Sequence, residues 1–295
     1  MKKSLHAFLT GLIDYAGFFP PAQLNLETSL NNFGLYLSQD YGWMLSRCIL
    51  PCNELENIQK DYDFRYSVIV SSAVTAEEIE SLSKFSKNIT MIEVSIADSD
   101  RNSAQYTEML AHIISRLELA NLSNIRLFIE ANQIAPVVDA IVQYNCSQTG
   151  SGSISAIGYK LRCGGTTSKA FPAVERVAEV ITTCSTRKIP FKFTGGLHQP
   201  LRYYHPEMAI MQHGFINVFG ASLLYAANRL PEDQIIECLE DEDATNIHFT
   251  DEQFSWKSYT LSTSEIDTLR ENRIVSFGSC SFEEPLEGLA GLGLL

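Results

Sequence analysis

The sequence predicts an α/β fold, an eight-stranded (β/α)8 barrel with a C-terminal extension. Two observations support this prediction: eight strand-like apolar runs follow one another, and amphipathic helix-like stretches separate most of them. The length of 295 residues and the 45% share of hydrophobic residues also suit one TIM barrel with a sizeable core. A doubly wound open sheet is the alternative, because the count of eight depends on a weak first run.

The predicted elements alternate regularly along the chain. The strand-like runs are 11–16, 43–50, 64–71, 89–96, 124–130, 154–162, 189–194 and 214–220. The helical patterns are 26–37, 54–60, 75–85, 103–119, 134–144, 171–185, 206–212, 221–228 and 231–239. We therefore expect residues 1–235 to form the barrel and residues 236–295 to form an appendage that packs on the barrel or on a partner subunit.

Composition narrows the range of partners. The formal net charge of −13 argues against nucleic acid or an anionic membrane surface. No run approaches the roughly 20 apolar residues of a membrane span. The seven cysteines are odd in number and lack a CxxC pair, which is typical of a cytoplasmic protein. We expect a small-molecule substrate and leave a homo-oligomer open; Cys163 and Cys280 are expected to be buried apolar residues, with a reactive thiol as the alternative.

Two lysines, Lys160 and Lys192, stand near the ends of apolar runs, and a glycine pair follows each of them. Alternation along 154–162 and 189–194 turns both lysines toward the barrel interior, while the apolar residues face the helices. A lysine at the carboxyl end of a barrel strand can act as an amine nucleophile. A second cation beside it would lower its pKa and leave part of it unprotonated near neutral pH.

Further polar residues are predicted on the same interior face. Alternation turns Glu93 inward on the fourth run, and Glu130 and Asp14 point inward near the ends of the fifth and first runs, with Asp14 as a candidate substrate contact. Arg162 follows Lys160 on the same face and suits a carboxylate or phosphate. The lysines could instead pair with these glutamates in a structural layer of salt bridges, which would add little net stability.

Histidines gather after the seventh run. His198, which follows a glycine pair and one leucine, is a candidate for substrate contact or proton transfer. His205 and His213 lie nearby in the sequence, but their spacing matches no recognised metal-binding motif. We therefore expect neither a metal nor an organic cofactor.

These segments resemble the class I aldolases of the deoxyribose-phosphate aldolase type, which are Schiff-base (β/α)8 barrels. That family has its imine-forming lysine on the sixth strand, a second lysine before a glycine pair on the seventh, and a glycine-alanine-serine motif after the eighth. The corresponding positions here are Lys160, Lys192 before Gly195-Gly196, and Gly220-Ala-Ser222. Residues 128–131, Phe-Ile-Glu-Ala, are similar to the family's turn after the fifth strand.

The resemblance implies roles for these residues, although the chain is a divergent member. Lys160 would form the imine and Lys192 would lower its pKa. The turns would supply backbone N–H groups or side chains to a substrate phosphate, at positions that comprise Gly164, Gly165, Gly195, Gly196, Arg202, Gly220 and Ser222. Either Glu93 or Ser95 matches the family's proton-relay aspartate. Leu-Arg-Cys-Gly-Gly follows Lys160, where the family has threonine-serine-threonine-glycine.

The expected function is that of a Schiff-base-forming lyase of the class I aldolase type. Its substrate would be a small carbonyl compound, phosphorylated or not, and Glu93 or Glu130 with a water would move protons. Two alternatives remain open. One is a non-catalytic barrel that binds phosphate or carboxylate, and the other is a different TIM-barrel enzyme, such as a phosphoribosyl-handling transferase.

Overall fold

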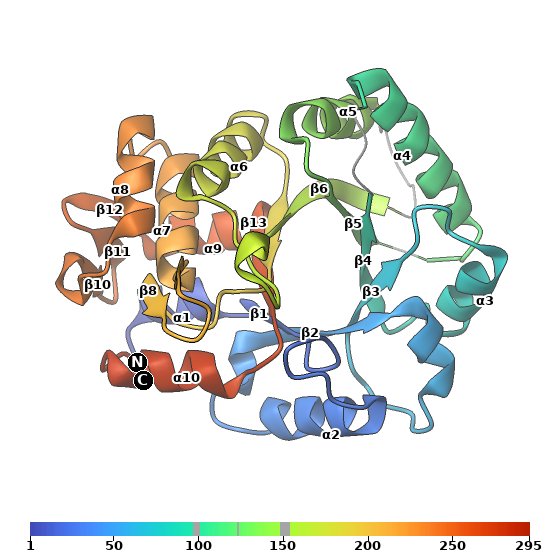
Figure 1. Ribbon diagram of the computed structural model, residues 1–295, viewed down its shortest axis with the longest axis horizontal. Coiled ribbons are helices and arrows are strands. Elements are labelled where there is room, and N and C mark those ends of the chain that lie inside the picture. Colours follow the sequence, from blue (N-terminus) through green and yellow to red (C-terminus); the bar gives the residue numbers. More distant parts are fainter. Residues whose placement is uncertain (97–100, 123, 148–153) are drawn as a thin grey trace.

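The chain forms a closed barrel of eight parallel strands (Figure 1). The computed structural model describes residues 1–96, 101–122, 124–147 and 154–295. In barrel order the strands are β1 (Ile13–Tyr15), β13 (Ile274–Ser279), β7 (Phe191–Thr194), β6 (Ile154–Arg162), β5 (Ile125–Glu130), β4 (Ile89–Ser95), β3 (Tyr66–Val70) and β2 (Leu45–Pro51). The predicted α/β barrel is confirmed, and the open-sheet alternative is wrong.

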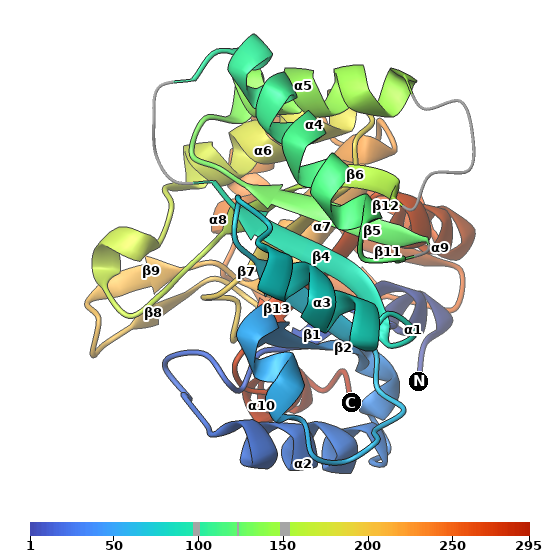
Figure 2. The ribbon, with the colours of Figure 1, turned by 90° about the vertical axis from the view of Figure 1, so that its right-hand side faces the viewer.

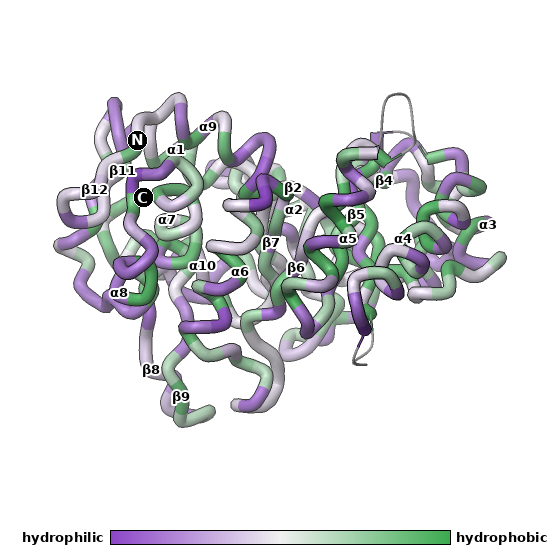
Figure 3. Tube along the Cα trace, turned by 90° about the horizontal axis from the view of Figure 1, so that it is seen from above, coloured by the Kyte–Doolittle hydropathy of each residue, from purple (hydrophilic) through white to green (hydrophobic). Residues whose placement is uncertain are grey.

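Helices surround this barrel (Figure 2). They are α1 (Lys3–Leu9), α2 (Leu26–Leu37), α3 (Ala76–Lys84), α4 (Ser103–Glu118), α5 (Ile134–Ser147), α6 (Val174–Thr186), α7 (Phe215–Ala226), α8 (Ile235–Glu240), α9 (Thr263–Asn272) and α10 (Glu283–Gly291). Apolar and polar residues alternate along the outer helices, as α4 illustrates (Figure 3). Tyr106, Leu110, Ile113 and Leu117 recur at helical spacing and are the buried side of α4. None of the helices in the described ranges is long and apolar enough to cross a membrane.

The eighth strand lies much later in the chain than the sequence predicts. It is β13, which pairs in parallel with both β1 and β7. The run 214–220 is instead the start of helix α7, in which every residue from Phe215 to Leu224 is buried. A helix enclosed on all sides shows a continuous apolar run, which has no periodicity that separates it from a buried strand. The prediction for this strand was therefore wrong.

The C-terminal segment is correspondingly more than an appendage. Residues 236–295 contain β13 itself, so the barrel does not close within residues 1–235. The same segment holds an antiparallel sheet of β10 (Ile247–Phe249), β11 (Gln253–Trp256) and β12 (Tyr259–Ser262). Figure 1 shows this sheet beside α7, α8 and α9 at one side of the barrel.

Two predicted helices also have a different structure. Residues 206–212 fall largely in a hairpin of β8 (Tyr203–His205) and β9 (Ile210–Gln212), which extends beyond the carboxyl ends of the barrel strands (Figure 2). Residues 54–60 overlap a 3-10 helix, η2 (Cys52–Asn57), between β2 and β3. Both stretches are short, and a few residues provide too little periodicity to specify a helix.

The barrel interior has an apolar layer beneath a charged one. Met91, Phe128 and Val275 form a buried cluster separate from the main core that the helices cover. Lys192 Nζ lies 3.4 Å from Met91 Sδ and 6.0 Å from the centroid of the Phe128 ring. The alternation of side chains along β4 and β7 thus places Glu93 and Lys192 inside the barrel, next to the apolar layer that contains Met91.

The packing of β13 against α7 provides a test of the revised topology. The ring of Phe277 is fully buried, 5.5 Å from that of Phe215 and 5.9 Å from that of Phe219. We expect Phe277→Ala to lower the free energy of unfolding by about 3–5 kcal/mol, because it leaves a cavity in this core. Urea unfolding followed by circular dichroism measures the loss. Tyr204→Ala, at a side chain that is 56% exposed, should change it by less than about 0.5 kcal/mol.

Candidate active site

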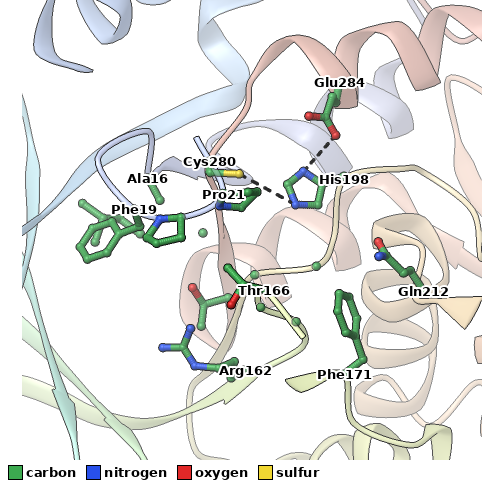
Figure 4. Close-up of a pocket in the computed structure, with 18 of the residues that line it drawn as sticks. Ala16, Phe19, Pro21, Arg162, Thr166, Phe171, His198, Gln212, Cys280 and Glu284 are labelled. Carbon is green, nitrogen blue, oxygen red and sulfur yellow. Dashed lines mark hydrogen bonds and ion pairs between the residues drawn. The ribbon is translucent and has the colours of Figure 1, made fainter. Parts of the chain in front are cut away.

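A cavity of about 400 Å³ opens at the carboxyl ends of the barrel strands. This is the end at which (β/α)8 barrels hold their active sites. Figure 4 shows that its walls come from several loops, with Phe19 and Pro21 opposite Phe171 and Gln212. The predicted site residues that line the cavity are Glu93, Lys160, Arg162, Gly164, Gly165, Gly195, Gly196 and His198.

The carboxylate of Glu93 joins the two lysines. Its Oε1 accepts hydrogen bonds from Lys192 Nζ at 2.6 Å and from Ser67 Oγ at 2.6 Å. Its Oε2 forms an ion pair with Lys160 Nζ at 2.6 Å. Burial alone would raise the pKa of Glu93, but Lys160 and Lys192 together hold it well below the ordinary range. Glu93 is therefore an anion between two cations, whereas Ser95 is exposed.

Lys160 has a second carboxylate partner, Glu130, which does not itself line the cavity. Its Nζ lies 2.8 Å from Glu130 Oε2, while Glu130 Oε1 accepts a hydrogen bond from Arg162 Nε at 2.8 Å. Burial would lower the pKa of Lys160, but the charges of Glu93 and Glu130 outweigh it and raise the pKa above 10.5. The expectation that Lys160 is partly unprotonated near neutral pH is therefore wrong. The charge of the lysine is stabilised by Glu93 and Glu130, the partners that the alternative of a salt-bridge layer had named.

Lys192 lies below the cavity and does not line it. Its side chain is fully buried, and Nζ donates to Asp14 Oδ2 at 2.7 Å as well as to Glu93. Asp14 also accepts a hydrogen bond from Ser276 Oγ at 2.5 Å, and Arg47 lies 3.4 Å from its other oxygen. Asp14 was predicted to contact substrate, but this network holds it beneath the cavity. Its role here is to neutralise Lys192.

The two glycine turns pack directly against each other. Gly195 and Gly196 both have φ of +69°, a conformation that favours glycine. A Cβ atom on Gly196 would lie 2.5 Å from the carbonyl oxygen of Cys163, and one on Gly164 would lie 2.5 Å from the Cα of Gly196. The Gly195 N–H donates to the carbonyl oxygen of Gly278, so this N–H is not available to an anion. Close packing of the two turns therefore explains why glycine occupies positions 164 and 196.

Besides Asp14, three predicted substrate contacts lie outside the cavity lining. Gly220 and Ser222 are buried within α7; Gly220 packs against the Phe254 ring, and Ser222 Oγ donates to the Val218 carbonyl oxygen. Their assignment depended on a strand that is in fact a helix. Arg202 is absent from the cavity lining and forms an ion pair with Glu240 at 3.6 Å.

The cavity also contains residues that the sequence prediction did not assign to a site. Cys280, which was expected to be buried, is partly exposed and directly follows β13. Its Sγ lies 4.0 Å from His198 Nε2, and His198 Nδ1 lies 3.2 Å from Glu284 Oε2 (Figure 4). Gly278 and Glu284 join them in the lining. The turn-forming Gly278-Ser279 after the apolar run 274–277 was the available sequence signal.

The other histidines do not assemble around His198. His213 is buried and contacts the Pro172 carbonyl oxygen at 2.9 Å, and burial lowers its pKa. His205 lines the cavity on the β8–β9 hairpin. In the described residues, no group of three or more His, Cys, Asp or Glu side chains is arranged to hold a metal ion.

A scan against protein-family models finds no match, and a search of curated proteins likewise finds none that matches the chain. The barrel fold is consistent with the aldolase resemblance, but the assignment to that particular class rests on the sequence motifs alone.

The buried charge network predicts a large effect of removing Lys192. Lys192→Met leaves Asp14 and Glu93 buried with one cation fewer, which should lower the free energy of unfolding by about 3–5 kcal/mol. Chemical denaturation at pH 7 measures the change. Lys84→Met is the control, since Lys84 is exposed and its ion pairs with Glu56 and Glu80 are at the surface. Equal losses in both variants would contradict the network's importance.

Proposed function

We propose that the protein is a Schiff-base-forming lyase of the class I aldolase type, with Lys160 as the amine. The observation that supports this most directly is the position of Lys160. Its Nζ has carboxylates on two sides, and the residue lines the cavity, whereas Lys192 does not. A carbonyl compound in the cavity can therefore approach Lys160, and Lys192 is left with the role of balancing charge below it.

The amine must lose its proton before it attacks. At rest, ion pairing keeps Lys160 protonated, so attack requires proton transfer to a neighbour. Glu93 Oε2 and Glu130 Oε2 lie 2.6 and 2.8 Å from Nζ, within range for that transfer. Glu130 is the better acceptor, because its side chain is 16% exposed and holds fewer buried cations than Glu93. The proton would then return to the hydroxyl of the carbinolamine as water leaves.

The same carboxylates suit the later steps. An iminium on Lys160 carries the positive charge that the ammonium carried, so its ion pairing with Glu93 persists. The iminium withdraws electrons from the adjacent carbon–carbon bond while Glu130 accepts the proton of the substrate hydroxyl, which becomes the carbonyl group of the first product. The carbon–carbon bond breaks and an enamine forms. Glu130 then returns the proton to the enamine carbon, and hydrolysis of the resulting iminium releases the second product.

The cavity indicates the size and charge of the substrate. A volume of about 400 Å³ admits a small metabolite. Arg162, whose side chain is 51% exposed, offers a guanidinium beside Lys160. A carbonyl compound with a carboxylate or phosphate at its far end would place that anion near Arg162 and the turn at Gly164-Gly165.

One observation favours a second candidate, a non-catalytic barrel that binds anions. Lys160 and Lys192 both have carboxylate partners, which is what a structural layer of salt bridges requires. In that case Arg162 and the glycine turns would bind a carboxylate or phosphate, and Lys160 would never react. Covalent trapping separates the two candidates.

Trapping with borohydride tests the imine directly. Incubation with small aldehydes or ketones, followed by borohydride, should leave a reduced adduct on the peptide that contains Lys160, as measured by mass spectrometry. Lys160→Arg should abolish this adduct, and Lys188→Arg, at an exposed lysine, should leave it unchanged. Adducts confined to exposed lysines such as Lys84 and Lys257 would favour the anion-binding barrel.

The pH dependence of trapping tests the proposed proton acceptor. Because the pKa of Lys160 is raised, the trapping rate at saturating carbonyl compound should rise with pH through neutrality and beyond pH 9. Glu130→Gln removes one charge that raises this pKa, so the rising limb should move to lower pH, about tenfold in free amine for each pKa unit. Asp139→Asn, in a surface ion pair with Arg187, is the matched control. A profile of Glu130→Gln that overlays that of the unmodified protein would exclude Glu130 from this role.

A further inference from the structure

The cavity contains a second group of reactive side chains, on the wall formed by β7 and β13. These strands are neighbours in the barrel, so the residues that follow them meet at its carboxyl end. Cys280 directly follows β13, and His198 lies in the loop after β7. Glu284, in the first turn of α10, completes a line of three side chains (Figure 4). None of these three residues takes part in the proposed lysine chemistry.

Their order is that of a nucleophile, a base and an orienting carboxylate. Cys280 Sγ lies 4.0 Å from Nε2 of His198, and Glu284 Oε2 lies 3.2 Å from Nδ1 on the opposite side of the ring. The carboxylate can thus fix the tautomer and hold the charge of the ring while Nε2 faces the thiol. A separation of 4.0 Å is long, but such pairs are often loose in the absence of substrate.

Other roles for this group fit the geometry less well. A single metal ion could not contact all three side chains through the atoms that face each other, because Cys280 and Glu284 lie at different ring nitrogens. A disulfide would need a second thiol, and among the described residues Cys280 is the only cysteine that lines the cavity. The role that fits is therefore a nucleophilic thiol, with His198 as its base and with Cys280 facing the cavity.

Cys280 and Glu284 favour the imidazolium that forms when His198 accepts the thiol proton. Burial would lower the pKa of His198, but Cys280 and Glu284 outweigh it and raise the pKa to about 9. His198 in turn lowers the pKa of Glu284, with a smaller contribution from His205. Tyr203 is the other titratable group on this wall, and burial raises its pKa to about 12, so it stays neutral. An imidazolium beside a thiol stabilises the thiolate.

We propose that Cys280, His198 and Glu284 form a second catalytic centre, which transfers acyl groups from small esters or thioesters. An acyl carbonyl is the electrophile that such a group serves, since the imidazolium can return its proton to the leaving group. The volume of the cavity restricts the acyl group to a small one. This centre does not depend on imine formation at Lys160, and its covalent product appears on a different peptide.

The reaction balances with water as the only co-substrate. The thiol proton passes to His198 Nε2, and the Cys280 sulfur attacks the carbonyl carbon to form a C–S bond. As the tetrahedral intermediate collapses, the bond to the leaving alcohol or thiol breaks and His198 protonates it. Water then attacks the acyl-thioester while His198 accepts its proton. The C–S bond breaks, the proton returns to sulfur, and a carboxylic acid leaves.

The test uses p-nitrophenyl acetate with the full chain. We expect a burst of about one nitrophenolate per chain and an acetyl group on the Cys280 peptide. Cys280→Ala should abolish the burst, and His198→Asn should slow acetylation of Cys280 by roughly 10²-fold or more. Cys146→Ala, which removes an exposed thiol outside the cavity, should leave the burst intact. Trapping at Lys160 in Cys280→Ala is a separate measurement, so failure of either chemistry is distinguishable.

A second measurement needs no folded variant. Iodoacetamide should alkylate Cys280 of the unmodified protein faster than it alkylates the exposed Cys146, because Cys280 Sγ lies beside the His198 ring that can accept its proton. Alkylation of Cys280 no faster than that of Cys146 would overturn the proposal. Acetylation confined to lysines or to Cys146 would overturn it as well.

Discussion

The carboxylate of Glu93 is the interaction on which the site depends. It accepts from Lys192 with one oxygen and pairs with Lys160 through the other, so a single anion links strands β4, β6 and β7 inside the barrel. Two buried cations need this anion and its neighbours, because unpaired charge in the interior costs several kcal/mol. Asp14 completes the charge balance through Lys192, and Glu130 completes it through Lys160.

The sequence predicted the site where the local pattern determines direction. Alternation along a strand is geometric, so the inward positions of Glu93, Lys160 and Lys192 followed from their places in apolar runs. The pKa of Lys160 did not follow, since it depends on which carboxylates face the lysine across the barrel. That choice is set by register between strands, which single-strand patterns do not specify.

The eighth strand shows a second limit of structure prediction from the sequence. Helix α7 is buried along its whole first part, and β13 has two partners and no distinctive run length, so both appear as short apolar segments. Because the sequence prediction took 214–220 as the eighth strand, the predicted site included Gly220 and Ser222. It did not include Gly278, Cys280 and Glu284, which line the cavity. Cys280 and Glu284 belong to the site because β13, and not the run 214–220, closes the barrel.

The two proposed chemistries lie on different walls of one cavity, with Lys160 on β6 and the Cys280 group after β13. The central claim about the lysine site is that Glu93 and Glu130 keep Lys160 charged. Titration of the lysine side-chain ammonium signals by ¹⁵N NMR tests it most directly. We expect the pKa of Lys160 to lie above the ordinary lysine value of 10.5, and Glu93→Gln to lower it. Titration of Lys160 near pH 7 in the unmodified protein would contradict it.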